Sequence, residues 1–222
     1  MNFLSFIIII TGYLLGSIPF GYLITKFSTG KNILEIGWRK TSGSNVFRNV
    51  GIWQGVLTGI LDLAKGSLAV WLARNLNSPA DIQILSGIAA IVGHNWSVFL
   101  KFSGGRGIAT LIGAFLILSP KILSLSLIPG LILAIIWNTS IGTIFFLIFA
   151  IFLSGYFNQW ETIGVFVTLS LFPIFIKRLS PIKEIFPLKN NLFLIRNRLI
   201  LDNDQLCLDL RIKRIIRKLT GK

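Results

Sequence analysis

The class of fold is decided by the segment Phe3–Ile24, which reads FLSFIIIITGYLLGSIPFGYLI. The segment carries no charge and, at about 1.5 Å per helical residue, is long enough to cross the roughly 30 Å hydrocarbon core of a bilayer. It lacks the basic start and the Ala-x-Ala-like end of a cleaved signal peptide, which predicts a retained membrane span. Gly16, Ser17 and Pro19 near its end permit close helix packing and a kink.

The composition extends this prediction to the whole chain. Hydrophobic residues make up 53% of the 222 residues, charged residues make up 14%, and the mean hydropathy is +0.76. Soluble domains carry about 25% charged residues, and the apolar runs here are continuous, without the alternation of a membrane barrel. We therefore expect an all-α integral membrane protein. Because Cys207 is the only cysteine and His94 the only histidine, no intramolecular disulfide and no metal site are expected. No cofactor is expected either.

Six further spans are expected after the first. Their approximate bounds are 52–73, 82–100, two short spans within 108–137, 140–157 and 162–176. The segment 108–137 taken alone fits either one kinked span or two short ones, because two proline-containing turns interrupt it. Two spans are required there if the strongly basic tail is cytoplasmic, which predicts seven spans in total, with the N-terminus outside and the C-terminus in the cytoplasm.

The end of the chain differs in composition from the spans. Twelve of the 22 Lys and Arg residues lie in 177–222 with four acidic residues, which gives this segment a charge of +8 (12 − 4). Such a segment after membrane spans predicts a cytoplasmic anchor on anionic lipid head groups, and no nucleic-acid partner is expected. We therefore divide the chain into a transmembrane domain, residues 1–180, and a basic cytoplasmic tail, residues 181–222, in which 192–201 and 206–212 have the pattern of two strands.

Two features inside the spans carry charge or polarity. Asp62 and Lys65 lie in the middle of the second span, where their i, i+3 spacing places them on one helix face and predicts an ion pair. The pair is expected to hold the helices together, and a direct role at a polar site is the alternative. The stretch Gly93–Thr110, GHNWSVFLKFSGGRGIAT, places His94, Lys101 and Arg106 around a glycine turn that precedes an apolar helix.

The glycine turn is suited to binding an anion. Glycines leave backbone N–H groups uncovered, an arginine lies among them, and a helix N-terminus favours negative charge. A flexible turn without a ligand is the alternative. Two crossings separate this turn from the polar segment 25–50, so both are expected on one face of the membrane, which brings together Arg39, Lys40, Arg48, Lys101 and Arg106.

These motifs, taken in order, resemble one family, the bacterial acylphosphate-dependent glycerol-3-phosphate acyltransferases of seven membrane spans. Gly16–Gly21 (GSIPFG) resembles the first-span signature of the family, and Asp62–Gly66 (DLAKG) resembles its second-span motif. Asn45–Arg48 (NVFR) matches the end of its first cytoplasmic motif, and Gly93–Thr110 matches its second motif nearly throughout. The resemblance covers roughly residues 10–145.

The resemblance implies a function and a site. The implied reaction is transfer of a fatty acyl group from acyl phosphate to glycerol 3-phosphate, which gives lysophosphatidic acid in phospholipid synthesis at the bacterial inner (plasma) membrane. Its implied partners are the two substrates and the lipid bilayer; the oligomeric state is not readable. The implied phosphate-binding residues are Asn45, Arg48, Lys101, Gly104, Gly105, Arg106, Gly107 and Thr143, and the implied catalytic residues are Ser42, His94 and Ser140.

The chain also departs from the pattern of this family. The serine of the first motif falls on Trp38, so that Ser42 or Ser44 would have to supply its hydroxyl, and the second motif has Arg106 where lysine is usual. The histidine and asparagine of the third motif are missing, and Arg178 and Pro181 are nearest to their places. A catalytically degenerate homologue that binds phosphate or lipid is therefore the alternative function, and a small transporter or channel is a second one.

Overall fold

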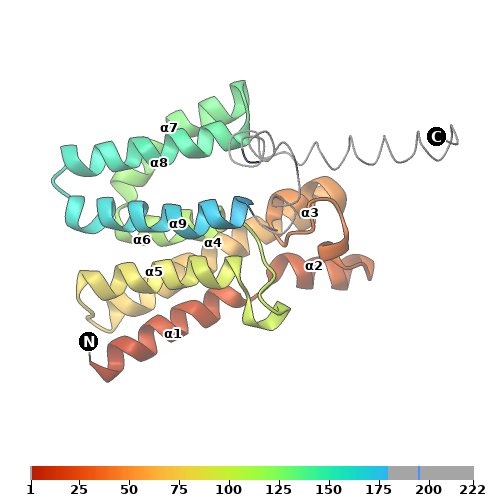
Figure 1. Cartoon of the computed structure of the whole chain (residues 1–222), viewed down its shortest axis with the longest axis horizontal. Coiled ribbons are helices and arrows are strands. Elements are labelled where there is room, and N and C mark those ends of the chain that lie inside the picture. Colours follow the sequence, from red (N-terminus) through yellow and green to blue (C-terminus); the bar gives the residue numbers. More distant parts are fainter. Residues whose placement is uncertain (1, 180–194, 196–222) are drawn as a thin grey trace, which may run out of the picture.

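The computed structural model describes residues 2–179 and 195, and within residues 2–179 every regular element is a helix. An isolated bridge between Ser97 and Ser103 is the extended pairing found in that part of the chain. The strands expected in 192–201 and 206–212, like the rest of the predicted tail, fall outside the described residues apart from Ile195. The helices, in order, are α1 (Phe3–Ser17), α2 (Phe20–Thr29), η1 (Ile33–Glu35), α3 (Gly43–Asn49), α4 (Ile52–Asn75), α5 (Ala80–Asn95), η2 (Val98–Leu100), α6 (Ile108–Leu118), α7 (Pro120–Ile136), α8 (Thr139–Tyr156), η3 (Trp160–Gly164) and α9 (Val165–Leu179) (Figure 1).

The helix ends follow from local chemistry. Asn2 caps α1 by accepting the backbone N–H of Ser5 at 2.9 Å, and Asn138 caps α8 in the same way through the N–H groups of Ser140 and Ile141. The first apolar segment breaks at Ile18-Pro19, because a residue before proline disfavours helical geometry. Gly30 ends α2 in the left-handed conformation with φ of 70°.

The expected spans correspond to helices, with one difference in length. The segment 108–137 forms two helices that meet at Ser119, rather than one kinked helix. The predicted end of the third span, 82–100, is wrong. The corresponding helix α5 ends at Asn95, because the chain turns there into η2 and the glycine segment. Four stretches, Phe3–Thr29, Ile52–Asn75, Thr139–Tyr156 and Trp160–Leu179, are long and apolar enough to cross a bilayer, and α6 and α7 are shorter apolar helices. The count of seven crossings stays a prediction.

Small residues set the distance between neighbouring helices. A Cβ added to Gly16 of α1 would overlap the backbone of Ala90 in α5, and one added to Gly113 of α6 would overlap the carbonyl group of Leu63 in α4. Helices in a bilayer associate through such close packing, because lipid tails are as apolar as the side chains. The pairs α1–α5 and α4–α6 are accordingly among the most extensively packed in the bundle, together with α7–α8.

The interior and the exterior of the bundle are both apolar. Phe115, Phe146 and Phe166 form the centre of the main buried cluster, with ring centroids of Phe115 6.1 Å and 6.0 Å from those of the other two. Large apolar side chains also cover the outside, and Ile135 and Phe172 are 85% and 73% exposed. A surface of this kind is suited to contact with lipid, which agrees with the composition.

Candidate active site

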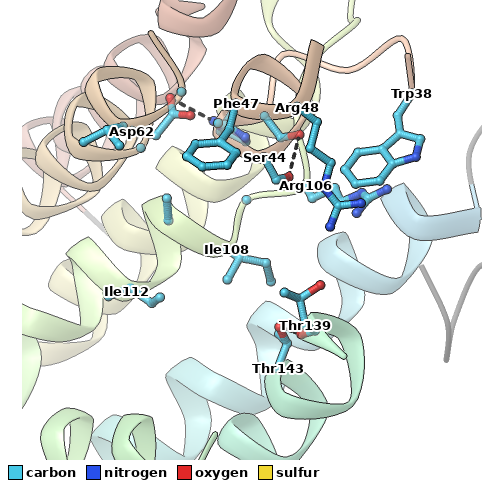
Figure 2. A pocket seen from close by; sticks show the side chains of 18 of the residues that line it. Trp38, Ser44, Phe47, Arg48, Asp62, Arg106, Ile108, Ile112, Thr139 and Thr143 are labelled. Atoms are coloured by element: carbon cyan, nitrogen blue, oxygen red, sulfur yellow. Dashed lines mark hydrogen bonds and ion pairs between the residues drawn. The ribbon is translucent and has the colours of Figure 1, made fainter. Parts of the chain in front are cut away.

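A cavity of about 540 Å³ opens where α3, α4, α6, α8 and α9 approach one another beside the C-terminal end of α5. Figure 2 shows Trp38, Arg48 and Arg106 together at one end of it, Ile108 and Ile112 of α6 along its wall, and Thr139 and Thr143 on the far side from Ser44. One end is therefore cationic and another part is apolar. The residues that carry its polarity are Trp38, Ser42, Ser44, Arg48, Asp62, His94, Arg106, Thr139, Thr143 and Arg178.

The glycine turn lies directly against the end of α5. The N–H of Gly105 donates to the carbonyl oxygen of His94 at 3.0 Å, and a Cβ on Gly105 would overlap Nε2 of the same histidine. Gly107, with φ of 79°, then begins α6 from the left-handed region that favours glycine. The expected start of a helix at the end of this turn is confirmed.

The turn and the polar segment 25–50 meet at one end of the bundle, as expected. The N–H of Thr41 donates to the carbonyl oxygen of Gly104 at 3.4 Å. The guanidinium carbons of Arg48 and Arg106 lie 4.8 Å and 4.7 Å from the centre of the same Trp38 ring. Two cations from distant parts of the chain thus share one aromatic side chain at the edge of the cavity.

Asp62 and Lys65 form the expected ion pair. Their side chains lie 2.9 Å apart and are almost fully buried, and Nζ of Lys65 also donates to the carbonyl oxygen of Ile18 at 3.0 Å. Nδ1 of His94 lies 3.4 Å from the same Asp62 oxygen. The carboxylate therefore links α4 to α5, and Lys65 links α4 to the chain between α1 and α2. Asp62 and His94 also line the cavity.

The first turn of α8 and the last turn of α9 contribute the remaining polar groups. Nη1 of Arg178 donates to Oγ of Ser140 at 2.7 Å, and Arg178 lines the cavity although it is only 4% exposed. The hydroxyl of Thr143 donates to the carbonyl oxygen of Thr139 at 2.6 Å, and both threonines face the cavity. Arg178 thus brings a third guanidinium to the cavity from another helix.

The structure brings together about half of the site residues that the sequence suggested. Ser42, Arg48, His94, Arg106, Gly107 and Thr143 line the cavity, as does Asp62. The other suggested residues, Asn45, Lys101, Gly104, Gly105 and Ser140, are not among its lining residues, and neither is Lys65. Lys101 is exposed with φ of 51°, whereas Asn45 and Ser140 are buried and support neighbouring lining residues.

Three polar lining residues were not among those that the sequence suggested: Trp38, Thr139 and Arg178. Trp38 and Arg178 stand at positions where the chain departs from the motif pattern. The sequence therefore marks both positions, but as places where an expected functional residue is missing. Thr139 gives no signal in the sequence, because one threonine at the start of an apolar helix is unremarkable. Among the described residues, no three His, Cys, Asp or Glu side chains gather where they could hold a metal ion.

Comparison with known proteins supplies a family for this arrangement. The family model described as glycerol-3-phosphate acyltransferase matches residues 6–187. A glycerol-3-phosphate acyltransferase of Prochlorococcus marinus is 37% identical over 174 residues, 75% of this chain and 87% of that protein. Glycerol-3-phosphate acyltransferase 5 of Dehalococcoides mccartyi is 33% identical over 211 residues, 92% of this chain and 91% of that protein.

Two solved structures have the same fold. They are crystal structures of PlsY (YgiH), an integral membrane glycerol 3-phosphate acyltransferase, in a glycerol 3-phosphate form and a lysophosphatidic acid form. Each is 26% identical to this chain and covers 82% of it, with 92% of the solved chain aligned; the TM-scores are 0.73 and 0.70. The all-helical fold and the membrane location expected from the sequence are therefore confirmed.

Proposed function

Because this chain belongs to the glycerol-3-phosphate acyltransferase family, we propose that it transfers a fatty acyl group to glycerol 3-phosphate and releases lysophosphatidic acid, with the cavity at the end of α5 as its active site. The observation that carries this proposal is the meeting of Arg48, Arg106 and Arg178 with an apolar wall in one cavity. A phosphorylated acceptor and an acyl chain need those two surroundings side by side.

Arg48 and Arg106 are the proposed ligands of the acceptor phosphate. Each carries a planar guanidinium that can bind two phosphate oxygens at once, and both lie at Trp38. Gly107 and the following N-terminus of α6 add the positive end of a helix dipole. Thr143 and Ser42 supply hydroxyl groups on other walls. Asn45 supports the loop of Trp38, and Gly104 and Gly105 let the turn pack on His94.

The acyl wall of the proposed site consists of side chains from α4 and α6. Val56, Ile108 and Ile112 line the cavity, and the glycines Gly55 and Gly59 leave room beside them. An acyl chain bound there would exchange lipid for protein at little free-energy cost, because both surroundings are apolar. The reacting carbonyl group would then lie near the cationic end, where the phosphate groups are held.

The proposed donor is an acyl phosphate. The hydroxyl oxygen of glycerol 3-phosphate attacks the acyl carbon, the bond from that carbon to the phosphate oxygen breaks, and the phosphate leaves with the electron pair and accepts the hydroxyl proton. No covalent enzyme intermediate is required, since phosphate is a good leaving group. The protein contributes by holding two anions next to each other and by offsetting their repulsion with guanidinium groups. His94, held by Asp62, is the one imidazole available to assist the proton transfer.

Purified protein in lipid vesicles, supplied with acyl phosphate and radiolabelled glycerol 3-phosphate, tests the proposal. We expect labelled lysophosphatidic acid and an equal amount of inorganic phosphate. Replacing Arg106 by alanine is expected to raise KM for glycerol 3-phosphate at least tenfold, because a charge-assisted contact is worth about 1.5–3 kcal/mol. Absence of product from folded wild-type protein would overturn the assignment.

The alternative function is a catalytically degenerate homologue that binds phosphate or lipid. It is favoured by Trp38 and Arg178, which stand where the motif pattern has groups of different chemistry. The same preparation distinguishes the two: glycerol 3-phosphate binding measured by calorimetry, without turnover of acyl phosphate, would support the degenerate homologue and exclude the enzyme.

A further inference from the structure

Trp38 lies in the segment between η1 and α3, and one buried side chain holds that segment in place. Oδ1 of Asn45 accepts the N–H of Trp38 at 3.0 Å, while Nδ2 of Asn45 donates to the carbonyl oxygens of Ile36 and Lys40 at 3.1 Å and 2.8 Å. Asn45 is 0% exposed, so these bonds do not compete with water. The backbone is therefore fixed before, at and after Trp38, although no helix contains it.

The residues on both sides of Trp38 have an unusual backbone conformation. Gly37 and Arg39 both have φ of 55°, in the left-handed region. For an arginine, this conformation costs roughly 1–2 kcal/mol of free energy relative to the right-handed one, and it persists only where the surroundings enforce it. A Cβ on Gly37 would overlap Oδ1 of Asn45. The backbone that carries the indole ring is thus held in one conformation.

At that position the indole ring meets two guanidinium groups from different parts of the chain. Arg48 belongs to the last turn of α3, and Arg106 belongs to the glycine turn before α6. Their guanidinium carbons lie 4.8 Å and 4.7 Å from the ring centre, and all three side chains line the cavity. Two like charges repel each other, and the negative face of an indole ring offsets part of that repulsion.

From this geometry we infer that Trp38 is a positioning residue that holds Arg48 and Arg106 as a two-arginine clamp for one phosphate monoester dianion. The inference rests on the proposed function, in which that dianion is the phosphate of glycerol 3-phosphate. A guanidinium that lies over a ring contacts the ring with its flat face, and its planar N–H edge is the part that can bind phosphate oxygens. A dianion between the two edges neutralises both charges, so the clamp is complete only with its ligand.

The same geometry accounts for the identity of residue 106. An ammonium group is a compact, strongly hydrated charge without a planar face, so a lysine at 106 would keep the charge but lie less favourably over the indole ring. Trp38 and Arg106 are both departures from the motif pattern described above, and the structure places them in contact. They therefore act as a matched pair, and the effects of replacing them are expected to be coupled.

A double-mutant cycle on the full-length protein in lipid vesicles tests the clamp. The variants are Trp38→Ser, Arg106→Lys and the double variant, with Trp38→Phe as the conservative replacement. Trp53→Ser is the matched control, because Trp53 is 59% exposed near the start of α4 and does not line the cavity. KM for glycerol 3-phosphate, KM for acyl phosphate and kcat are measured for each, together with the Kd for glycerol 3-phosphate by calorimetry.

We expect Trp38→Ser to raise KM and Kd for glycerol 3-phosphate about tenfold, with kcat and KM for acyl phosphate within about twofold of wild type. Trp38→Phe should retain about half of the wild-type affinity for glycerol 3-phosphate or more, and Trp53→Ser should change none of these constants. The double variant should bind more tightly than the product of the two single effects predicts, because one shared contact is lost only once.

The outcomes separate the clamp from the proposed reaction. Three results with an active enzyme would overturn the clamp and leave the reaction standing. The first is an unchanged KM and Kd for glycerol 3-phosphate in Trp38→Ser. The others are an equal impairment of kcat and of both KM values in that variant, or strictly additive effects of the two single replacements. Binding by wild type without turnover would overturn the reaction, and the Kd values would still decide the clamp. Neither binding nor turnover by wild type would overturn both.

Discussion

Arg178 and Ser140 join the last turn of α9 to the first turn of α8 through a 2.7 Å hydrogen bond from Nη1 to Oγ. Both side chains are buried, with exposures of 4% and 1%, and only Arg178 reaches the cavity. The serine that the motif resemblance marked as catalytic is therefore the hydrogen-bond partner of an arginine that faces the cavity. A buried cation held by a hydroxyl group has few alternative conformations, which favours precise placement of its charge.

Replacing Arg178 by alanine is expected to lower kcat/KM by about 10²-fold, because a charge near the reacting phosphate groups is lost. Ser140→Ala should lower it less, about threefold to tenfold, since the guanidinium stays but is held less firmly. Initial rates with both substrates check this order. Arg74→Ala, an exposed arginine near the opposite end of α4, is the control. A larger effect of Ser140→Ala than of Arg178→Ala would return the direct role to the serine.

The ion pair of Asp62 and Lys65 makes a prediction about stability. Asp62→Asn leaves a buried ammonium group without its carboxylate and is expected to reduce the free energy of unfolding by about 3–5 kcal/mol. The double variant Asp62→Asn, Lys65→Met removes both charges and should regain a large part of that loss. Thermal unfolding in detergent, followed by intrinsic tryptophan fluorescence, measures both. A double variant less stable than the single one would contradict this account.

Gly105→Ala is expected to displace the glycine turn, because the added methyl group overlaps the imidazole of His94. Both groups are buried, so neither can move without opening the packing between the turn and α5. We expect a loss of at least 2 kcal/mol in stability and a higher KM for glycerol 3-phosphate. Gly155→Ala is the matched control: its Cβ would meet no atom within 4 Å, and alanine should there stabilise α8 by up to about 1 kcal/mol.

The predicted topology of seven crossings, with the N-terminus outside, can be tested by thiol labelling. Arg74 donates to the carbonyl oxygen of Ile117, and Lys121 lies over the ring of Phe157, so the turns after α4, α6 and α8 share one end of the bundle. In a Cys207→Ser background, cysteines at Asn75 and Glu161 should react with an impermeant maleimide in intact spheroplasts. A cysteine at Lys31 should react only after lysis. Labelling of Lys31→Cys in intact spheroplasts would show that the orientation in the membrane is the reverse of the predicted one.

Continuous apolar sequence determined the class of fold without any tertiary information. A bilayer requires about 20 uncharged residues per span and an internal partner for every backbone group, so runs such as Phe3–Ile24 leave no soluble alternative. Local chemistry also determined the break at Pro19 and the Asp62–Lys65 pair. Each depends on residues that are neighbours in the chain, which is why the sequence alone was sufficient.

Only the tertiary structure decided which side chains meet at the cavity. Trp38, Arg48 and Arg106 lie on three separate segments of the chain. Whether the two arginines both contact the Trp38 ring depends on how α3, α4 and α6 pack against one another, which no local sequence pattern encodes. Likewise Arg178 reaches the cavity because α9 packs against α5 and meets Ser140 of α8. In the sequence, positions 38 and 178 show only that the residues expected from the family motifs are missing. In the folded chain they bring an indole ring and a guanidinium to the same site, because side-chain chemistry acts through distance in space and not along the chain.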